Sequence, residues 1–149
     1  MKLAEALQER ADLNRRIEQL RSRLSANALY QEGTETPEDP GALLKELNEC
    51  CDRLAELITA INQANCRITV NGKTLTQYIA EKDVLAVRLA AYHDLISEAS
   101  HSVYRARNSE IRILSSVDVR LLQKEADRMS AELRTLNNTL QAANWSEEL

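Results

Sequence analysis

The sequence contains one carboxylate and imidazole pair spaced as at some metal centres, Glu98-x-x-His101. In di-iron helical bundles, two helices each carry such a motif, and two further glutamates complete the inward-pointing ligand set. Here the motif occurs once, and in the heptad frame of its predicted helix both residues lie away from the seam. Ser100 and Ser102 flank His101, yet no acid stands at a position that defines a catalytic triad. The sequence therefore predicts no metal and no cofactor, and it leaves enzymatic activity undecided while favouring a non-enzymatic role.

Charged residues gather in a second place, the stretch 107–116, RNSEIRILSS, which interrupts the helical period. Arg105, Arg107 and Arg112 surround Glu110, an arrangement typical of a structural salt-bridge cluster or of an anion site. The aliphatic residues of the same stretch favour a short strand or an extended link. We therefore retain Arg107, Glu110 and Arg112 as candidate ligand-binding residues beside the structural alternative.

A third group of candidates lies where the second and fourth predicted helices end. An antiparallel, up-down-up-down arrangement brings these two ends together, and the residues that it gathers there are Asn62, Asn65, Asn144 and Trp145. Asparagines can cap helix ends and a tryptophan can plug a bundle, which is a purely structural role. A polar pocket with an aromatic floor, suited to a small molecule, is the alternative.

Four helices are expected to position these residues. Apolar residues that recur at steps of three and four predict helices over about 2–28, 40–65, 74–106 and 116–143. Between the second and third, residues 67–75 combine strand formers with an Asn-Gly pair, which predicts a β-hairpin. The expected fold is all-α: an antiparallel four-helix bundle with long coiled-coil-like helices and a small hairpin, forming a single domain over residues 1–149.

Local signals predict where several of these helices begin. Asp39 followed by Pro40 suits the N-cap and first turn of the second helix. Thr74 with Gln77 forms a capping box for the third, and Ser115 or Ser116 is expected to cap the fourth.

The third predicted helix carries two apolar stripes. One is a seam of large residues at a and d positions, which include Leu75, Tyr78, Leu85, Leu89, Tyr92 and Ile96. The other has the same spacing on the flank and back of the helix and consists of Ala80, Val84, Val87, Ala91 and Leu95. Because one neighbour covers only one stripe, the second requires another buried neighbour or another subunit. We therefore predict a homo-oligomer with Val84, Val87, Ala91 and Leu95 at the interface.

Composition limits the classes of partner and compartment. The net charge of −4 argues against a role dominated by nucleic-acid contacts, and the arginine-rich face of the first helix is interspersed with acids, which favours ion pairs. No secretory signal and no membrane-length apolar run are evident, so we expect a cytoplasmic protein without a membrane partner. Three cysteines fit neither a disulfide framework nor zinc spacing, and we expect Cys50 and Cys51 to be small core residues.

Several motifs together resemble a known family. The opening MKLAEALQERADLNRRIEQL, then INQAN, NGKTL, EKD, SEIR and the closing LQAANW are similar to a family of small bacterial proteins of uncharacterised function, some of which carry the name septicolysin. The resemblance spans nearly the whole chain and implies a shared helical architecture without catalytic residues. The toxin-like name implies pore formation, from which this sequence departs through its mean hydropathy of −0.42 and its lack of a membrane-length segment.

The sequence contains no motif that names a reaction. A cytoplasmic, self-associating helical protein with a structural or interaction role is the first hypothesis. The alternative is a small-molecule-binding protein or enzyme that uses either the Asn65/Asn144/Trp145 end or the Arg107–Arg112 loop.

Overall fold

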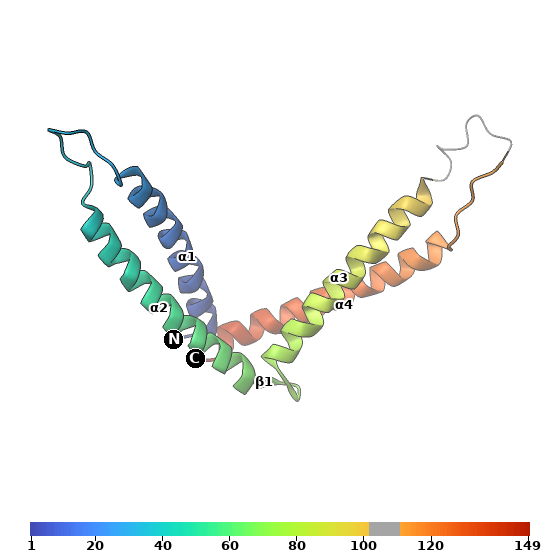
Figure 1. Cartoon of the computed structure of the whole chain (residues 1–149). Coiled ribbons are helices and arrows are strands. Elements are labelled where there is room, and N and C mark those ends of the chain that lie inside the picture. Colours follow the sequence, from blue (N-terminus) through green and yellow to red (C-terminus); the bar gives the residue numbers. More distant parts are fainter. Residues whose placement is uncertain (102–110) are drawn as a thin grey trace. The chain divides into compact units, whose positions relative to one another are not determined.

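The computed structural model describes residues 1–101 and 111–149, and within these ranges it contains four helices and one hairpin (Figure 1). In chain order the elements are α1 (Leu3–Ala26), α2 (Pro40–Arg67), β1 (Thr69–Val70), β2 (Lys73–Thr74), α3 (Leu75–Ser100) and α4 (Val119–Ser146). The predicted all-α fold with a small antiparallel hairpin is confirmed. The chain divides into two compact units, and the single-domain organisation stays a prediction: unit 1 is Met1–Thr69 with Ala143–Leu149, and unit 2 is Val70–Ala142.

Unit 1 is built around the antiparallel pair of α1 and α2, which pack closely along their length (Figure 1). Its core consists of aliphatic residues from both helices and from the end of α4, namely Leu3, Ala6, Leu20, Leu43, Leu57, Ile61, Ala64, Ile68 and Ala143. Small residues within this core allow the two helix axes to approach. Each fully buried Leu or Ile side chain stabilises the fold by about 1.5–3 kcal/mol relative to an exposed one.

A buried amide joins the end of α1 to the loop before α2. Asn27 is the one buried polar side chain among the described residues. Its Nδ2 donates to the carbonyl of Arg23 at 2.8 Å, and its Oδ1 accepts from the backbone N–H of Glu38 at 3.0 Å. The Glu38 carboxylate in turn accepts from the guanidinium of Arg23, with both oxygens 3.1 Å from Nε. The acidic loop is thus fixed at one point, just before Asp39 caps α2 by accepting from Gly41 N–H, as predicted.

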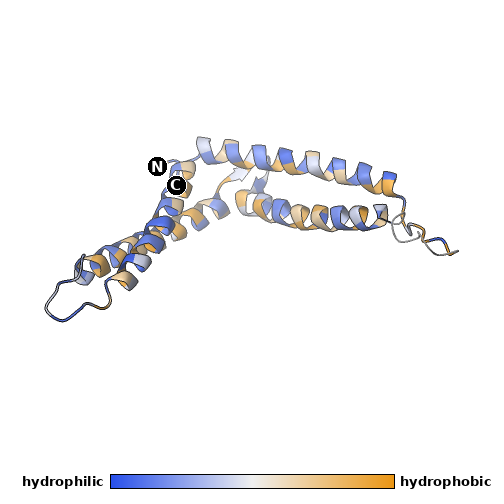
Figure 2. Ribbon diagram, turned by 90° about the horizontal axis from the view of Figure 1, so that it is seen from above, coloured by the Kyte–Doolittle hydropathy of each residue, from blue (hydrophilic) through white to orange (hydrophobic). Residues whose placement is uncertain are grey.

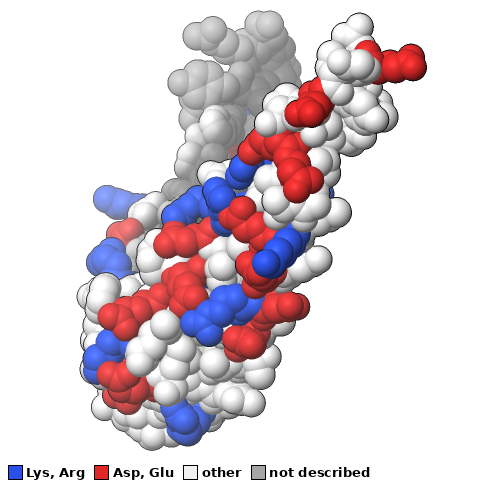
Figure 3. Space-filling model, turned by 90° about the vertical axis from the view of Figure 1, so that its left-hand side faces the viewer, with Lys and Arg blue, Asp and Glu red and all other residues white. Residues whose placement is uncertain are grey.

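The arginines of α1 form ion pairs rather than a basic patch. Arg16 donates to Glu46 of α2 at 2.6 Å, and Arg53 of α2 binds both oxygens of Glu9 at 2.7 and 3.0 Å. Further along α1, Arg15 and Arg21 pair with acids three residues earlier on the same helix. Figure 3 shows basic and acidic side chains intermixed on the side of the molecule that it presents. The expected mixed-charge face is therefore present, and most of its ion pairs lie within unit 1.

The two ends of the chain pair with each other inside unit 1. Lys2 and Glu148 form an isolated antiparallel bridge, supported by backbone hydrogen bonds from Leu3 N–H to Glu147 O and from Leu149 N–H to Met1 O, both 3.0 Å. The Lys2 ammonium lies 2.9 Å from the Glu148 carboxylate. Hydrogen bonds from the Met1 amino group and from Lys2 lower the pKa of Glu148.

In unit 2, the hairpin packs onto the first turns of α3. Tyr78 donates its hydroxyl to the carbonyl of Val70 at 3.2 Å, and the Lys73 ammonium lies 5.8 Å above the same ring. Lys73 also pairs with Glu81 at 2.7 Å. The turn requires left-handed backbone at Asn71 and Gly72, with φ of 50° and 81°, which explains the Asn-Gly pair. The predicted capping box of Thr74 and Gln77 then starts α3.

Helices α3 and α4 run antiparallel within unit 2 but approach less closely than α1 and α2 do (Figures 1 and 2). The buried residues of these two helices within unit 2 are Leu75, Tyr78, Leu85, Ala126, Met129, Leu136 and Leu140. Several other seam residues of α3, among them Leu89, Tyr92 and Ile96, are only half-buried. The pairing of α3 with α4 therefore leaves part of the α3 seam accessible to solvent.

Two boundaries differ from those predicted. Helix α3 ends at Ser100, whose hydroxyl donates to the carbonyl of Ile96 at 2.7 Å and so competes with the backbone ladder; residues 102–106 of the predicted helix lie outside the described ranges. Helix α4 is capped by Asp118, which accepts from Leu121 N–H at 3.1 Å. Neither serine caps it, because the Ser115 hydroxyl is used in a local turn with Val117.

The cysteine prediction is partly wrong. All three cysteines are free thiols, Cys50 is half-buried, and Cys51 is exposed. Adjacent residues on a helix point about 100° apart, so only one member of the pair can face α1. Separately, none of the described helices combines the length and apolar character needed to cross a membrane.

We predict that Leu20→Ala lowers the free energy of unfolding by about 2–5 kcal/mol, because Leu20 is fully buried and truncation leaves a cavity. Leu44→Ala makes the same chemical change at a side chain that is 49% exposed and should cost less than about 1 kcal/mol. Urea unfolding followed by circular dichroism measures both. Equal losses for the two variants would contradict the assigned core.

We further predict that acid weakens unit 1 through Glu38 and Glu9. Hydrogen bonds from Arg23 and Arg53, respectively, lower the pKa of these carboxyls in the folded chain. A depressed folded pKa means that the stabilisation is complete above the unfolded value of about 4.3 and is lost as pH falls through the folded pKa. Glu38→Gln should therefore reduce stability at neutral pH and flatten its loss in acid, measured by thermal unfolding between about pH 7 and pH 3.

Glu35→Gln provides the matched control, since Glu35 lies exposed in the same loop. An acid profile of Glu38→Gln identical to that of the native chain would contradict the role of the Arg23 pair.

Candidate interaction surface

The outward side of α3 presents a continuous row of apolar side chains. We call this row, Ala80, Val84, Val87, Ala91 and Leu95, the outer stripe. All five residues are exposed, and the three largest, Val84, Val87 and Leu95, retain 58%, 72% and 43% of their accessible surface. At 1.5 Å per residue the stripe extends for about 22 Å along the helix. The residues that were predicted to form an interface are therefore aligned and accessible.

The outer stripe is exposed because α3 has apolar side chains on two sides and, among the described residues of unit 2, one partner helix. Tyr78 and Leu85 of this helix are buried, whereas Val84 and Val87 stay exposed. Figure 2 shows apolar residues recurring along α3. It is the most apolar of the four described helices and the least amphipathic. A helix of this kind is typical of a buried position with more than one neighbour.

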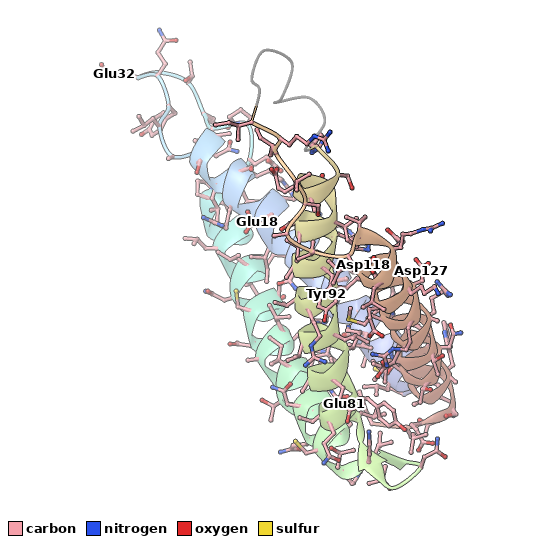
Figure 4. The ribbon with its side chains drawn as sticks, turned by 90° about the vertical axis from the view of Figure 1, so that its right-hand side faces the viewer. Glu18, Glu32, Glu81, Tyr92, Asp118 and Asp127 are labelled. Atoms are coloured by element: carbon pink, nitrogen blue, oxygen red, sulfur yellow. The ribbon has the colours of Figure 1, made fainter. Side chains whose placement is uncertain are left out.

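A groove of about 540 Å³ runs between α3 and α4 and joins the outer stripe. Apolar residues from both helices line it, namely Ala80, Val84, Leu85 and Leu136, and so do the charged residues Lys73, Glu81, Arg88 and Glu132. Figure 4 shows Glu81 near the beginning of α3. The hydrogen bond to Glu81 raises the pKa of Lys73, so this ion pair is formed across the neutral range. We refer to this feature as the α3/α4 groove.

A smaller hollow of about 240 Å³ lies at the other end of α3. Leu95, Glu98, Ala99 and His101 line one side, and residues 113–116 line the other. Glu98 and His101, which are spaced as at some metal centres, thus lie together at the wall of this shallow hollow. No group of three or more His, Cys, Asp or Glu side chains suited to a metal ion occurs in the described part of the chain.

The asparagine and tryptophan candidates all belong to unit 1 and differ in their exposure. Asn65 and Asn144 are half-buried, Asn62 is exposed, and Trp145 retains 65% of its surface. Trp145 therefore does not plug a core. Asn144 lies inside α4, which continues to Ser146, so it does not cap the end of that helix.

The candidates of the Arg107–Arg112 loop are only partly observable. Arg107 and Glu110 lie outside the described residues. Arg112 is exposed, and among residues 1–101 and 111–149 it forms no ion pair. It lies in an irregular, extended segment, residues 111–116, whose Ile111 and Leu114 are 78% and 77% exposed.

Sequence reasoning missed two parts of this surface. It treated the aliphatic residues of the 111–116 segment as a strand or link and did not anticipate their exposure. Glu132 of α4 also went unmentioned, although it lines the α3/α4 groove. An apolar Ile-x-Ile-Leu run between charged residues is a detectable signal, whereas the position of Glu132 depends on the relative rotation of two helices.

Comparison with known proteins gives a family and a fold but no activity. A model of a family of unknown function, DUF6847, matches residues 10–149. The chain is 34% identical to a functionally unknown conserved protein from Corynebacterium diphtheriae, whose crystal structure superposes with a TM-score of 0.92 over 100% of this chain and 98% of that chain. No curated protein matches the sequence. The resemblance to an uncharacterised family is thus confirmed, and the name septicolysin receives no support from these comparisons.

Proposed function

We propose that this chain, which belongs to DUF6847, a family of unknown function, is a self-associating interaction protein of the cytoplasm. The proposal is based on the surface of the chain itself. Two copies pair through the outer stripe of α3. The single observation that carries this proposal is the exposure of Val84, Val87 and Leu95 in one aligned row. A contiguous apolar row of this kind on a helix marks an interaction site more often than isolated exposed residues do.

A second copy of the same chain is the partner that best fits the stripe. Most soluble oligomers are homo-oligomers with twofold symmetry, which requires a self-complementary patch. In an antiparallel pairing of two α3 helices, Val84 of one copy meets Ala91 of the other, and Ala80 meets Leu95. Large residues then face small ones along the row, and the twofold axis passes near Val87.

The surroundings of the stripe also suit a protein partner. The charged residues along the α3/α4 groove carry both signs, so two copies need not repel each other. Two α3/α4 pairs placed together by a twofold axis would form a four-helix arrangement, in which the half-buried seam residues of α3 become more completely covered. The free thiols agree with a reducing cytoplasm, where disulfides are rare.

We predict that Val87→Arg converts the dimer to monomers, because it introduces two charges that would face each other near the twofold axis in an apolar interface. The helix content should remain unchanged, since Val87 is 72% exposed in the single chain. Native mass spectrometry and circular dichroism measure the two properties.

Ser97→Arg is the matched control, because Ser97 is exposed on α3 but lies off the stripe. A Val87→Arg protein with the same native mass as the unmodified chain would contradict the proposed interface.

A small-molecule site at Asn65, Asn144 and Trp145 is the second candidate function. The observation that favours it is an indole that is 65% exposed and that directly follows the half-buried Asn144 in the sequence. Aromatic rings combined with a few polar groups are typical of ligand sites. The alternative site at the Arg107–Arg112 loop lies largely outside the described residues.

We predict for this second candidate that a ligand retained by the purified protein, or found by a thermal-shift screen, loses its effect in Trp145→Ala. Trp145 is the only tryptophan of the chain, so its fluorescence reports binding directly. Arg134→Ala, an exposed change on α4 outside the candidate site, serves as the control. A saturable shift that Trp145→Ala leaves intact would exclude this end of the molecule.

A further inference from the structure

The extended segment 111–116 has a composition that a single copy of the chain does not explain. Ile111, Ile113 and Leu114 are 78%, 46% and 77% exposed, and they follow one another within four residues. Arg112 lies among them and forms no ion pair with another described residue. Three aliphatic side chains around an unpaired cation are suited to an apolar groove that contains an unpaired acid.

The α3/α4 groove of a second copy provides such a site. Its apolar lining comes from Ala80, Val84, Leu85 and Leu136. Glu132 lines the same groove and forms no ion pair with another described residue, whereas Glu81 is already paired with Lys73 at 2.7 Å. The charge of Arg112 is opposite to that of Glu132. Lys73 and Arg128 act on Glu132 only through electrostatic attraction, without a direct ion pair, so its carboxylate is available to a further cation.

The antiparallel pairing proposed above brings these two features together. The segment 111–116 borders the hollow at the end of α3, beside Leu95 and Glu98. The groove begins at the opposite end of the same helix, beside Ala80 and Glu81. When Ala80 of one copy meets Leu95 of the other, the end of each α3 lies beside the beginning of its partner. A twofold axis perpendicular to the plane of two antiparallel helices places the same flank of each helix on the same side of the pair. The segment of one copy therefore faces the groove of the other.

We propose that residues 111–116 of each copy pack into the α3/α4 groove of the other, with Ile113 and Leu114 against its apolar lining and Arg112 paired with Glu132. This inference rests on the proposed self-association and adds the residues that determine its register. The exchange is reciprocal, so every dimer contains two such contacts. In this exchange the exposed aliphatic segment is buried against the partner copy, and Arg112 takes part in partner recognition.

A charge exchange tests the proposal. Arg112→Glu and Glu132→Arg, each alone, place like charges opposite each other and should raise the dimer dissociation constant by about three- to tenfold. The double variant restores an ion pair of opposite polarity and should return the constant to within about twofold of the native value. Sedimentation velocity over a concentration series measures the constant for each protein, and Arg120→Glu controls for a general change of charge near the segment.

The outcomes separate this inference from the self-association itself. Weakening by each single variant with restoration in the double variant supports the Arg112–Glu132 contact. A native dimer that is dissociated by Val87→Arg but unaffected by both charge variants overturns the contact and leaves the α3 interface in place. A native protein that is monomeric at all concentrations overturns both. Circular dichroism of each variant ensures that a change in mass reflects association, because both residues are exposed in the single chain.

Discussion

A helix with apolar side chains on two sides needs two neighbours, and this requirement governs the second unit of the chain. In α3 the side chains of Tyr78 and Leu85 are buried, while the residues of the outer stripe stay exposed. Burial of a Val or Leu side chain is worth about 1.5–3 kcal/mol. Covering Val84, Val87 and Leu95 would therefore contribute several kcal/mol, which is comparable to the net stability of a small domain. An exposed row of this size is a strong reason for a partner.

In contrast to unit 2, unit 1 covers the apolar side chains of its core and pairs its buried polar groups within itself. Its helices pack closely, its ends are joined by the bridge of Lys2 and Glu148, and Asn27 has hydrogen-bond partners for both its donor and its acceptor. Its arginines are largely paired with acids of α1, α2 or the intervening loop. Isolated ion pairs at such exposed sites contribute little stability, so the aliphatic core is the main source of cohesion. The interaction surface that we propose accordingly lies in the α3/α4 unit, where the core is less complete.

The features that sequence predicted well depend on local chemistry. Asp39, Thr74 and the Asn71-Gly72 turn act within a few residues of their position, and the two stripes of α3 follow from helical periodicity alone. The features that it missed depend on contacts distant in sequence or on helix rotation. The pairing of Lys2 with Glu148, the burial of Asn27 and the groove position of Glu132 are of this kind. Cys51 was placed in the core because a wide apolar stripe does not show which of two adjacent residues faces the neighbouring helix.

The native mass of the unmodified chain of 149 residues tests the central claim most directly. We predict a species of twice the 16.8 kDa subunit mass, populated at micromolar concentration and diminishing on dilution. A bare 16.8 kDa monomer that persists at the highest concentrations attainable would contradict it. In that case the exposure of Val84, Val87 and Leu95 would require a different partner, and the antiparallel α3 pairing would have to be abandoned.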